Sequence, residues 1–473
     1  MLAAAASNAA ANLGLSRASG DASRNCEADN RLAWKSYVGF RHAGCLTRVA
    51  ESPQRRFRSG QIEREQCLKS RRQCGKIVCT TANVARGRFY LNVTGFPFPL
   101  NPLAFRRTVR TEVDPGSIWF FEQEQGLAGT NVTTNVRMTV IKLKSGGLWV
   151  HAPIAPTEEC VRLIKELGEP VKYIVLTTYA YEHKVFVSPF ARKFPKAQVW
   201  VAPGLWSYPI PLPVEAFGIF KAGTIKDDAT ETPWQDEIEH KVLESSPVGS
   251  VPGIGPYVEL AFFHKASKSL LVTDAVIRVP DTPPEVIRKE ALLDSARNGV
   301  VVSLRSGGKP IPDFKLFPGS NRIDDTEENR LLGWQRMLLL GLYFGPSDLL
   351  DPQESFRAIA GRLLVSPVVR TLVFTKIPDE ALDWADRIVK DWRFQRVITC
   401  HLDSPIATSP REFRACFAFL EELVPGRRKK GLLDFFKAKT QNTGFVEEDF
   451  ATLKGLDAFL VNLGVVPKPG PRN

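Results

Sequence analysis

The order of apolar segments along the chain predicts an α/β fold. Short runs with β-type composition at residues 117–122, 135–143 and 148–152 precede an amphipathic helical pattern at 157–167, and another apolar run at 173–176 follows it. Strands that alternate with helices are typical of α/β domains. Hydrophobic residues make up 44% of the chain, an ordinary value for a globular protein with a buried core.

Turn and cap residues delimit the first of these elements. Lys144-Ser145-Gly146-Gly147 separates two β runs and predicts a hairpin turn. Thr157 stands where a helix N-cap is expected, Val161 and Ile164 follow at helical spacing, and Gly168 ends the pattern. The sequence therefore predicts a β-hairpin, a helix and a buried strand in succession.

The second half of the chain predicts further strands around a mostly helical segment. Strands are expected at residues 198–202, 257–264, 269–273, 369–374 and 394–399. Residues 281–385 otherwise favour helix, and strong helices are expected at 381–392 and 410–423.

Four regions follow from this pattern in a chain of 473 residues. Residues 1–79 are interpreted as an organelle transit peptide and residues 80–134 as a lead-in segment. Residues 135–425 form the main α/β domain, with a helical insertion at about 281–385. Residues 426–473 form an amphipathic C-terminal tail.

The N-terminal segment has the composition of a targeting sequence. Residues 1–20 contain Arg17 but no acidic residue, and they are rich in Ala, Ser, Asn and Leu. This composition is typical of transit peptides, and the Ala and Ser content favours a chloroplast over the alternative, a mitochondrion. The competing interpretation is a disordered extension with a function of its own.

The charge distribution argues against a nucleic-acid partner. Of the net charge of +12, a surplus of 8 lies in residues 1–79, which contain 14 Lys and Arg against 6 Asp and Glu. The rest of the chain has only the short basic cluster 427–430, without the basic and aromatic pattern of nucleic-acid binding proteins.

No segment of the sequence predicts a transmembrane helix. The most apolar run is Met337–Phe344, which is far shorter than the roughly 18 residues that a membrane-spanning helix needs. We interpret it as a buried helix.

Ligand-type side chains follow three of the expected strands. Glu182 and His183 come after the run 173–176, Asp274 follows 269–273, and His401 follows 394–399. Imidazole nitrogen and carboxylate oxygen are ligands that zinc, iron and manganese accept. The set predicts a site for one divalent metal ion, which would activate water for hydrolysis. The competing interpretation is that these groups bind no metal and hydrogen-bond to one another at the strand ends.

Three other histidines, His151, His240 and His264, lie within the expected α/β domain. His151 ends a neighbouring strand and is an additional candidate for the pocket, with a hydrogen-bonded core histidine as the competing interpretation. His264 is expected at a hairpin tip opposite the site, and His240 in a polar segment; neither is expected to take part. The sequence contains no nucleophile elbow, phosphate-binding loop or dinucleotide fingerprint that would indicate another chemistry.

Residues Thr177–His183 resemble the Thr-His-x-His-x-Asp-His signature of the metallo-β-lactamase superfamily. In that superfamily a carboxylate after a later strand bridges the metals and a final histidine closes the site, positions that Asp274 and His401 take here. The resemblance covers roughly residues 135–425. It implies an αββα sandwich, with the helical segment as an insertion.

The chain resembles more closely a family of plant, algal and cyanobacterial proteins that carry a domain of unknown function. The segments 148–153, 180–184 and 194–199 carry this likeness. It implies the same fold but no particular activity.

The superfamily signature is incomplete. Thr178 and Ala180 stand where the first two histidines are expected, and Ile254 follows Pro252-Gly253 where a third often occurs. The resemblance implies that the first metal site is missing, whereas Glu182, His183, Asp274 and His401 fill the second.

Two functions remain open at this point. One is a divergent metal-dependent hydrolase of an ester-type bond. The other is a non-catalytic binding or assembly module, in which the helical insertion contacts a protein partner through Trp334 and residues 337–344. Neither a substrate nor a partner can be named from the sequence.

Overall fold

The computed structural model describes residues 87–92, 100–127, 132–205, 212–247, 256–306, 308–310, 323–426 and 444–470. The expected transit peptide at 1–79 lies outside these ranges. So do Pro252-Gly253-Ile254 and the basic cluster 427–430.

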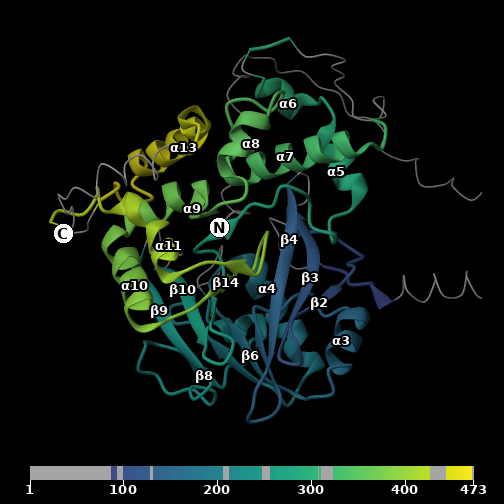
Figure 1. The fold of residues 1–473 in the computed structure, drawn as a ribbon, viewed down its shortest axis with the longest axis vertical. Coiled ribbons are helices and arrows are strands. Elements are labelled where there is room, and N and C mark those ends of the chain that lie inside the picture. The colour runs from purple at the N-terminus through teal and green to yellow at the C-terminus, as the bar shows by residue number, and fades with distance from the viewer. Residues whose placement is uncertain are drawn as a thin grey trace, which may run out of the picture. The chain divides into compact units, whose positions relative to one another are not determined.

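Two β-sheets form the centre of the protein (Figure 1). The larger has eight strands in the order β1-β3-β4-β5-β6-β7-β8, with β2 paired to β3. Its strands are β1 (Leu100–Asn101), β2 (Val109–Asp114), β3 (Ile118–Leu127), β4 (Thr133–Lys142), β5 (Leu148–His151), β6 (Val171–Leu176), β7 (Gln198–Val201) and β8 (Gly223–Thr224). Pairing is antiparallel as far as β5 and parallel from β5 to β8.

The second sheet has five strands in the order β15-β14-β11-β10-β9. They are β9 (Ile238–Pro247), β10 (Pro256–His264), β11 (Ser269–Leu271), β14 (Arg396–Ile398) and β15 (Ile406–Ala407). Strands β11 and β14 pair in parallel, although more than a hundred residues separate them. Because parallel neighbours end at the same edge of a sheet, the segments that carry Asp274 and His401 emerge side by side. A further pair, β12 (Ile277–Arg278) and β13 (Leu363–Leu364), lies outside both sheets.

Alternation along the strands shows how the layers stack. On β3, Ile118 and Phe120 belong to the same buried cluster as Phe262 and Leu271 of the second sheet. Their neighbours Trp119 and Phe121 instead pack with residues of α3 (Glu158–Lys165) and α4 (Tyr181–Lys193). Successive strand residues point to opposite faces, so β3 is buried on both sides.

Helices also cover the outer face of the second sheet. The helix α10 (Pro378–Asp391) packs on β9, and the Trp384 indole N–H donates to the Lys241 carbonyl at 3.2 Å. Trp384 also contacts Phe413 of α11 (Pro410–Ala415), with ring centroids 6.2 Å apart. Helices thus flank both sheets, and the predicted αββα sandwich is confirmed.

The segment between β12 and α10 is helical, as expected. It contains α5 (Lys289–Ala296), α6 (Val300–Leu304), α7 (Glu327–Tyr343), α8 (Gln353–Ile359), α9 (Pro367–Leu372) and the 3-10 turn η3 (Phe374–Lys376). The remaining described helical elements are η1 (Val214–Phe217), η4 (Ala418–Leu420), η5 (Glu447–Phe450) and α13 (Ala451–Asn462).

The longest of these helices, α7, is buried along much of its length. Trp334 is fully buried and donates its indole N–H to the Pro280 carbonyl at 3.1 Å. Met337, Leu338 and Leu339 are buried as well. The interpretation of Met337–Phe344 as a buried helix is confirmed. The hypothesis that Trp334 and this run form an exposed anchor for a partner is wrong.

Two local predictions were wrong for identifiable reasons. Residues 369–374 form α9 and η3 instead of a strand, because Ser366 caps the helix and Pro367 occupies its first position. His240 lies in β9, a strand that was not expected, where its neighbours Ile238 and Val242 are buried. None of the described helices is long and apolar enough to cross a membrane.

Candidate metal centre

His183 reaches the site from the first turn of α4. Strand β6 ends at Leu176, and Ala180 precedes the helix with an extended backbone. The His183 N–H donates to the Ala180 carbonyl at 3.2 Å, so the helix has begun by this residue. Glu182 and His183 therefore lie in a helix and not in the loop that the sequence suggested.

Asp274 is held by a buried carboxylate on the neighbouring strand. The backbone N–H groups of Thr273 and Asp274 both donate to Glu259 Oε1, at 2.5 and 3.2 Å. Glu259 is fully buried on β10. The Thr273 hydroxyl lies 2.6 Å from that of Thr177 after β6, which joins the ends of the two sheets.

The ring of His401 is oriented by the backbone of β4. Its Nδ1 lies 2.8 Å from the backbone carbonyl of Asn135. Because a carbonyl oxygen can only accept, Nδ1 carries a proton, and Nε2 is the ring nitrogen that faces the site. Metal-binding histidines are commonly oriented by such a hydrogen bond to a backbone carbonyl.

The turn that carries His401 is bound tightly to β4. Leu402 has a left-handed backbone (φ 58°), an unfavourable conformation for a side chain of this size. Its N–H donates to Asn135 Oδ1 at 2.8 Å, and its carbonyl accepts from Arg137 Nη2 at 2.5 Å. Arg137 Nη1 also donates to the Thr399 carbonyl at 2.7 Å. These bonds hold a strained turn and thereby position His401.

The carboxylate of Glu122 holds the two side chains, Asn135 and Arg137, that bind this turn. Glu122 Oε1 accepts from Arg137 Nη2 at 2.7 Å and from Asn135 Nδ2 at 2.6 Å. Sequence reasoning missed Glu122, Asn135 and Arg137 as positioning residues. The signal that could have found two of them is the occurrence of Asn135 and Arg137 two positions apart, on one face of a strand whose other face carries Val136, Met138 and Val140.

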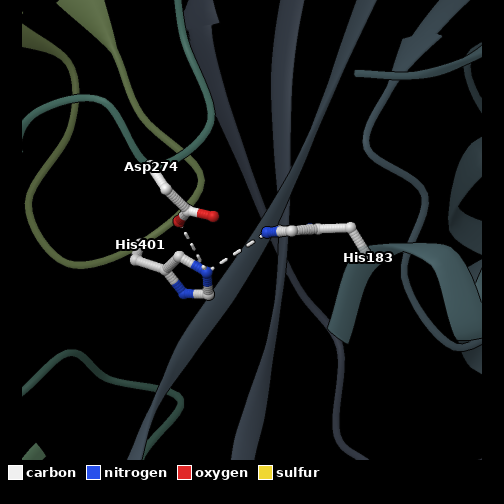
Figure 2. A group of neighbouring side chains, drawn as sticks. All are labelled: His183, Asp274 and His401. Atoms are coloured by element: carbon white, nitrogen blue, oxygen red, sulfur yellow. Dashed lines mark hydrogen bonds and ion pairs between the residues drawn. The ribbon is translucent and has the colours of Figure 1, made fainter. Parts of the chain in front are cut away.

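His183, Asp274 and His401 meet where the ends of the two sheets come together (Figure 2). The two Nε2 atoms are 3.2 Å apart, and His401 Nε2 is 3.4 Å from Asp274 Oδ1. One ligand atom from each residue lies within 4.8 Å of the others. Two nitrogens bound to a tetrahedral zinc ion at its usual bond length are about 3.3 Å apart. The observed spacing of the imidazoles therefore fits a single metal ion.

The charges in the cluster are suited to a cation. Burial, helped by the neighbouring His401, lowers the pKa of His183 to about 3 against the opposing charge of Glu182. Burial raises the pKa of Asp274 to about 6; His401 opposes this rise and Glu182 adds to it. At neutral pH the His183 ring is neutral and most Asp274 carboxyls are ionised, which are the forms that bind metals.

The other candidates lie outside the triad. Glu182 lines the same cavity as Asp274 and His401 but is not part of the close group of ligand atoms. His151 is fully buried, stacks on Trp149, and has its Nδ1 3.7 Å from the sulfur of Cys400. It occupies the core between the sheets. His240 and His264 are also buried away from the triad, each beside a local oxygen of Asp227 or Ser267.

A cavity of about 130 Å³ opens beside the triad. Glu182, Asp274 and His401 form part of its wall. The opposite wall is apolar and comes largely from α7, through Met337, Leu338, Gly341 and Leu342. The helical insertion therefore shapes the space next to the candidate metal centre.

The αββα sandwich, in which His183, Asp274 and His401 lie close together, is a metallo-β-lactamase-like fold. Within that class, the chain belongs to the family described as "Domain of unknown function (DUF4336)", whose model matches residues 115–352 and 350–419. No curated protein matches the sequence.

Several solved structures are similar to this chain at low identity. The metal-soaked Flv1 flavodiiron core from Synechocystis has 9% identity and a TM-score of 0.34, over 67% of this chain and 62% of that chain. A flavodiiron protein from Giardia intestinalis has 10% identity and a TM-score of 0.35, over 67% and 60%. A metallo-β-lactamase from Staphylococcus aureus has 12% identity and a TM-score of 0.22, over 40% and 49%. At these values the likeness does not extend to an activity.

Proposed function

We propose that the protein binds one divalent metal ion through His183, Asp274 and His401 and hydrolyses an ester-type bond. The observation that carries the proposal is the 3.2 Å approach of two imidazole Nε2 atoms beside a carboxylate oxygen. The hydrogen bond from Nδ1 to the Asn135 carbonyl orients the His401 ring so that its Nε2 faces both His183 and Asp274. Zinc, iron and manganese all accept these ligand types.

Three protein ligands are the usual number for a catalytic metal with an open coordination position. A bound divalent ion would lower the pKa of water and polarise a carbonyl oxygen. In the reaction, the water oxygen bonds to the acyl carbon and the bond from that carbon to the leaving oxygen breaks. Glu182, on the cavity wall beside Asp274 and His401, is assigned the transfer of the water proton to the leaving alcohol.

Elemental analysis of the full chain, purified without chelator or added metal, tests the metal site. We expect about one zinc, iron or manganese ion per chain, the stoichiometry of a three-ligand site. His183→Ala and His401→Ala should each lose it. His264→Ala is the matched control, since His264 is a buried histidine outside the triad, and it should keep the metal.

The variant Glu182→Gln separates the two roles considered for this carboxylate. As a proton carrier it should keep the metal and lose ester hydrolysis; as a ligand it should lose both. A well-folded wild-type protein without metal would overturn the proposal and leave the non-catalytic binding module as the explanation.

The composition of residues 1–79 supports a second, separate proposal, that the protein is imported into plastids. A fluorescent protein fused behind these residues should accumulate in plastids of a plant cell. Accumulation in mitochondria would replace this proposal with its alternative, and a cytosolic signal would contradict both.

A further inference from the structure

The cavity beside the triad has the size of a small apolar group. Its volume is about 130 Å³. For comparison, an engineered apolar cavity of about 150 Å³ in another protein stays dry and binds benzene. The space next to the candidate metal centre therefore holds on the order of six carbon atoms.

Most of the cavity wall away from the triad is apolar. Leu100, Ile277, Leu338, Leu342 and Val369 come from four different elements and line it together. The polar members of this part of the wall are Gln125, Thr133, Thr134 and Ser366. No Lys or Arg occurs among the described lining residues. A charged group on the bound part of a ligand would thus have no counter-ion there, and burying one would be unfavourable.

Gly341 provides part of this space. Glycine inside a helix costs about 1 kcal/mol relative to alanine, and Gly341 lies in the last turn of α7. A Cβ atom at Gly341 would lie 3.1 Å from Val132 Cγ1, and both residues line the cavity. A longer side chain at position 341 would therefore crowd this part of the wall. Gly455, in α13, has nothing within 4 Å of the same position.

The lining of the cavity combines two chemistries. Glu182 and Asp274 contribute two carboxylates beside His401, whereas Met337, Leu338 and Leu342 of α7 contribute apolar side chains. A ligand that fits this arrangement has a polar, uncharged head at the triad and a short apolar chain against α7. An ester with an unbranched acyl chain has this form.

We infer that the cavity binds the acyl chain of the substrate, and that this chain is uncharged, unbranched and about six carbons long. The inference rests on the proposed hydrolase function for the identity of the head group. It adds the acyl part of the substrate and the residues that select it, Gly341 above all. The alcohol part of the substrate would lie outside the cavity.

Hydrolysis of a series of p-nitrophenyl esters tests this selection. Each buried methylene contributes about 0.8 kcal/mol and hexanoyl has four more than acetyl, so kcat/KM should be about 200-fold higher for the hexanoyl ester if all four are buried. Chains of about twelve carbons should be hydrolysed less well than hexanoyl, because they exceed the cavity. Equal rates for acetyl and hexanoyl esters would overturn the inference while leaving the hydrolase intact.

Filling the cavity provides the matched variants. Gly341→Leu should lower kcat/KM about tenfold more for the hexanoyl ester than for the acetyl ester, and Gly341→Ala should have a smaller effect in the same direction. Gly455→Leu, the same substitution at an open helical position, should change neither. Equal loss for both esters in a folded Gly341→Leu protein would contradict selection of the chain by the cavity.

Binding of hexanamide, measured by calorimetry, separates this inference from the hydrolase. The amide should bind to the wild type and bind at least tenfold more weakly to Gly341→Leu. If no ester is hydrolysed but this difference is found, the cavity assignment stands and the proposed function fails. If esters are hydrolysed but hexanamide binds equally to both proteins, the function stands and the cavity assignment fails.

Discussion

His401 and His183 face each other across 3.2 Å, but the protein holds them in different ways. His401 donates Nδ1–H to Asn135, and its turn is bound by Asn135 and Arg137. His183 Nδ1 is buried and has no hydrogen-bond partner among the described residues. The second sheet and β4 thus orient one imidazole, whereas the other depends on the position of α4. The site is preorganised on one side only.

The largest effect should come from breaking the support of His401. Arg137→Met removes the guanidinium that donates to Glu122 and to the carbonyls of Thr399 and Leu402. Removing one partner of a buried ion pair costs about 3 kcal/mol or more, and second-layer changes lower metal affinity about 10- to 100-fold. Chemical denaturation and metal titration measure the two effects.

Arg110→Met is the matched control for that change. Arg110 forms an exposed ion pair with Glu166, which should contribute less than about 1 kcal/mol and should not affect metal binding. If both variants behave alike, the bonds from Arg137 do not position His401.

His151 can be compared with His183 and His401, because it is a buried histidine that lies outside the triad of candidate ligands. Burial lowers the pKa of His151 to about 3, below the 6.5 expected in the unfolded chain. Below pH 6.5 the His151 ring binds a proton in the unfolded chain but not in the folded protein. The free energy of unfolding therefore falls as the pH is lowered toward 3. Between pH 7 and pH 5 this residue should cost about 2 kcal/mol.

His151→Leu should remove that part of the acid sensitivity. The free energy of unfolding, measured with chelator present, should fall less in the variant than in the wild type between pH 7 and pH 5. Parallel curves for the two proteins would show that His151 is not held neutral in the folded state.

The smallest loss of stability is expected from a substitution far from His183 and His401. Thr157 caps α3 by accepting the Cys160 N–H at 3.0 Å. Thr157→Ala should cost about 1 kcal/mol of stability, since a helix cap is lost, and should leave metal content unchanged. Loss of metal in this variant would mean that the site responds to general destabilisation, and not only to changes in the contacts of His401.

Much of the sandwich was predictable because its strands are apolar and end at clear turns. The runs that became β4, β6 and β10 were located to within two residues, and the parallel ends of β11 and β14 bring Asp274 and His401 together. The pairing of these two strands could not be derived from composition. The resemblance to a known fold placed Asp274 and His401 in one site, but it was not used to predict this pairing.

Other features depend on tertiary contacts that a strand or helix pattern does not encode. The run 369–374 is rich in β-branched residues, yet the cap at Ser366 and the proline after it favour helix. The roles of Asn135 and Arg137 depend on a turn more than 260 residues away in the sequence. Glu182 was expected in the ligand set, but the first turn of α4 directs it to the cavity wall instead.

The candidate ligands come from distant parts of the chain, with 218 residues between His183 and His401. An unfolded chain would have to close loops of this length to bring them together, so the ion should bind the native state almost exclusively. By mass action, a ligand at 100 times its dissociation constant then adds about 2.7 kcal/mol to the stability of the fold. Removal of the ion should lower the melting temperature, and a cell starved of the metal would hold less of the folded protein.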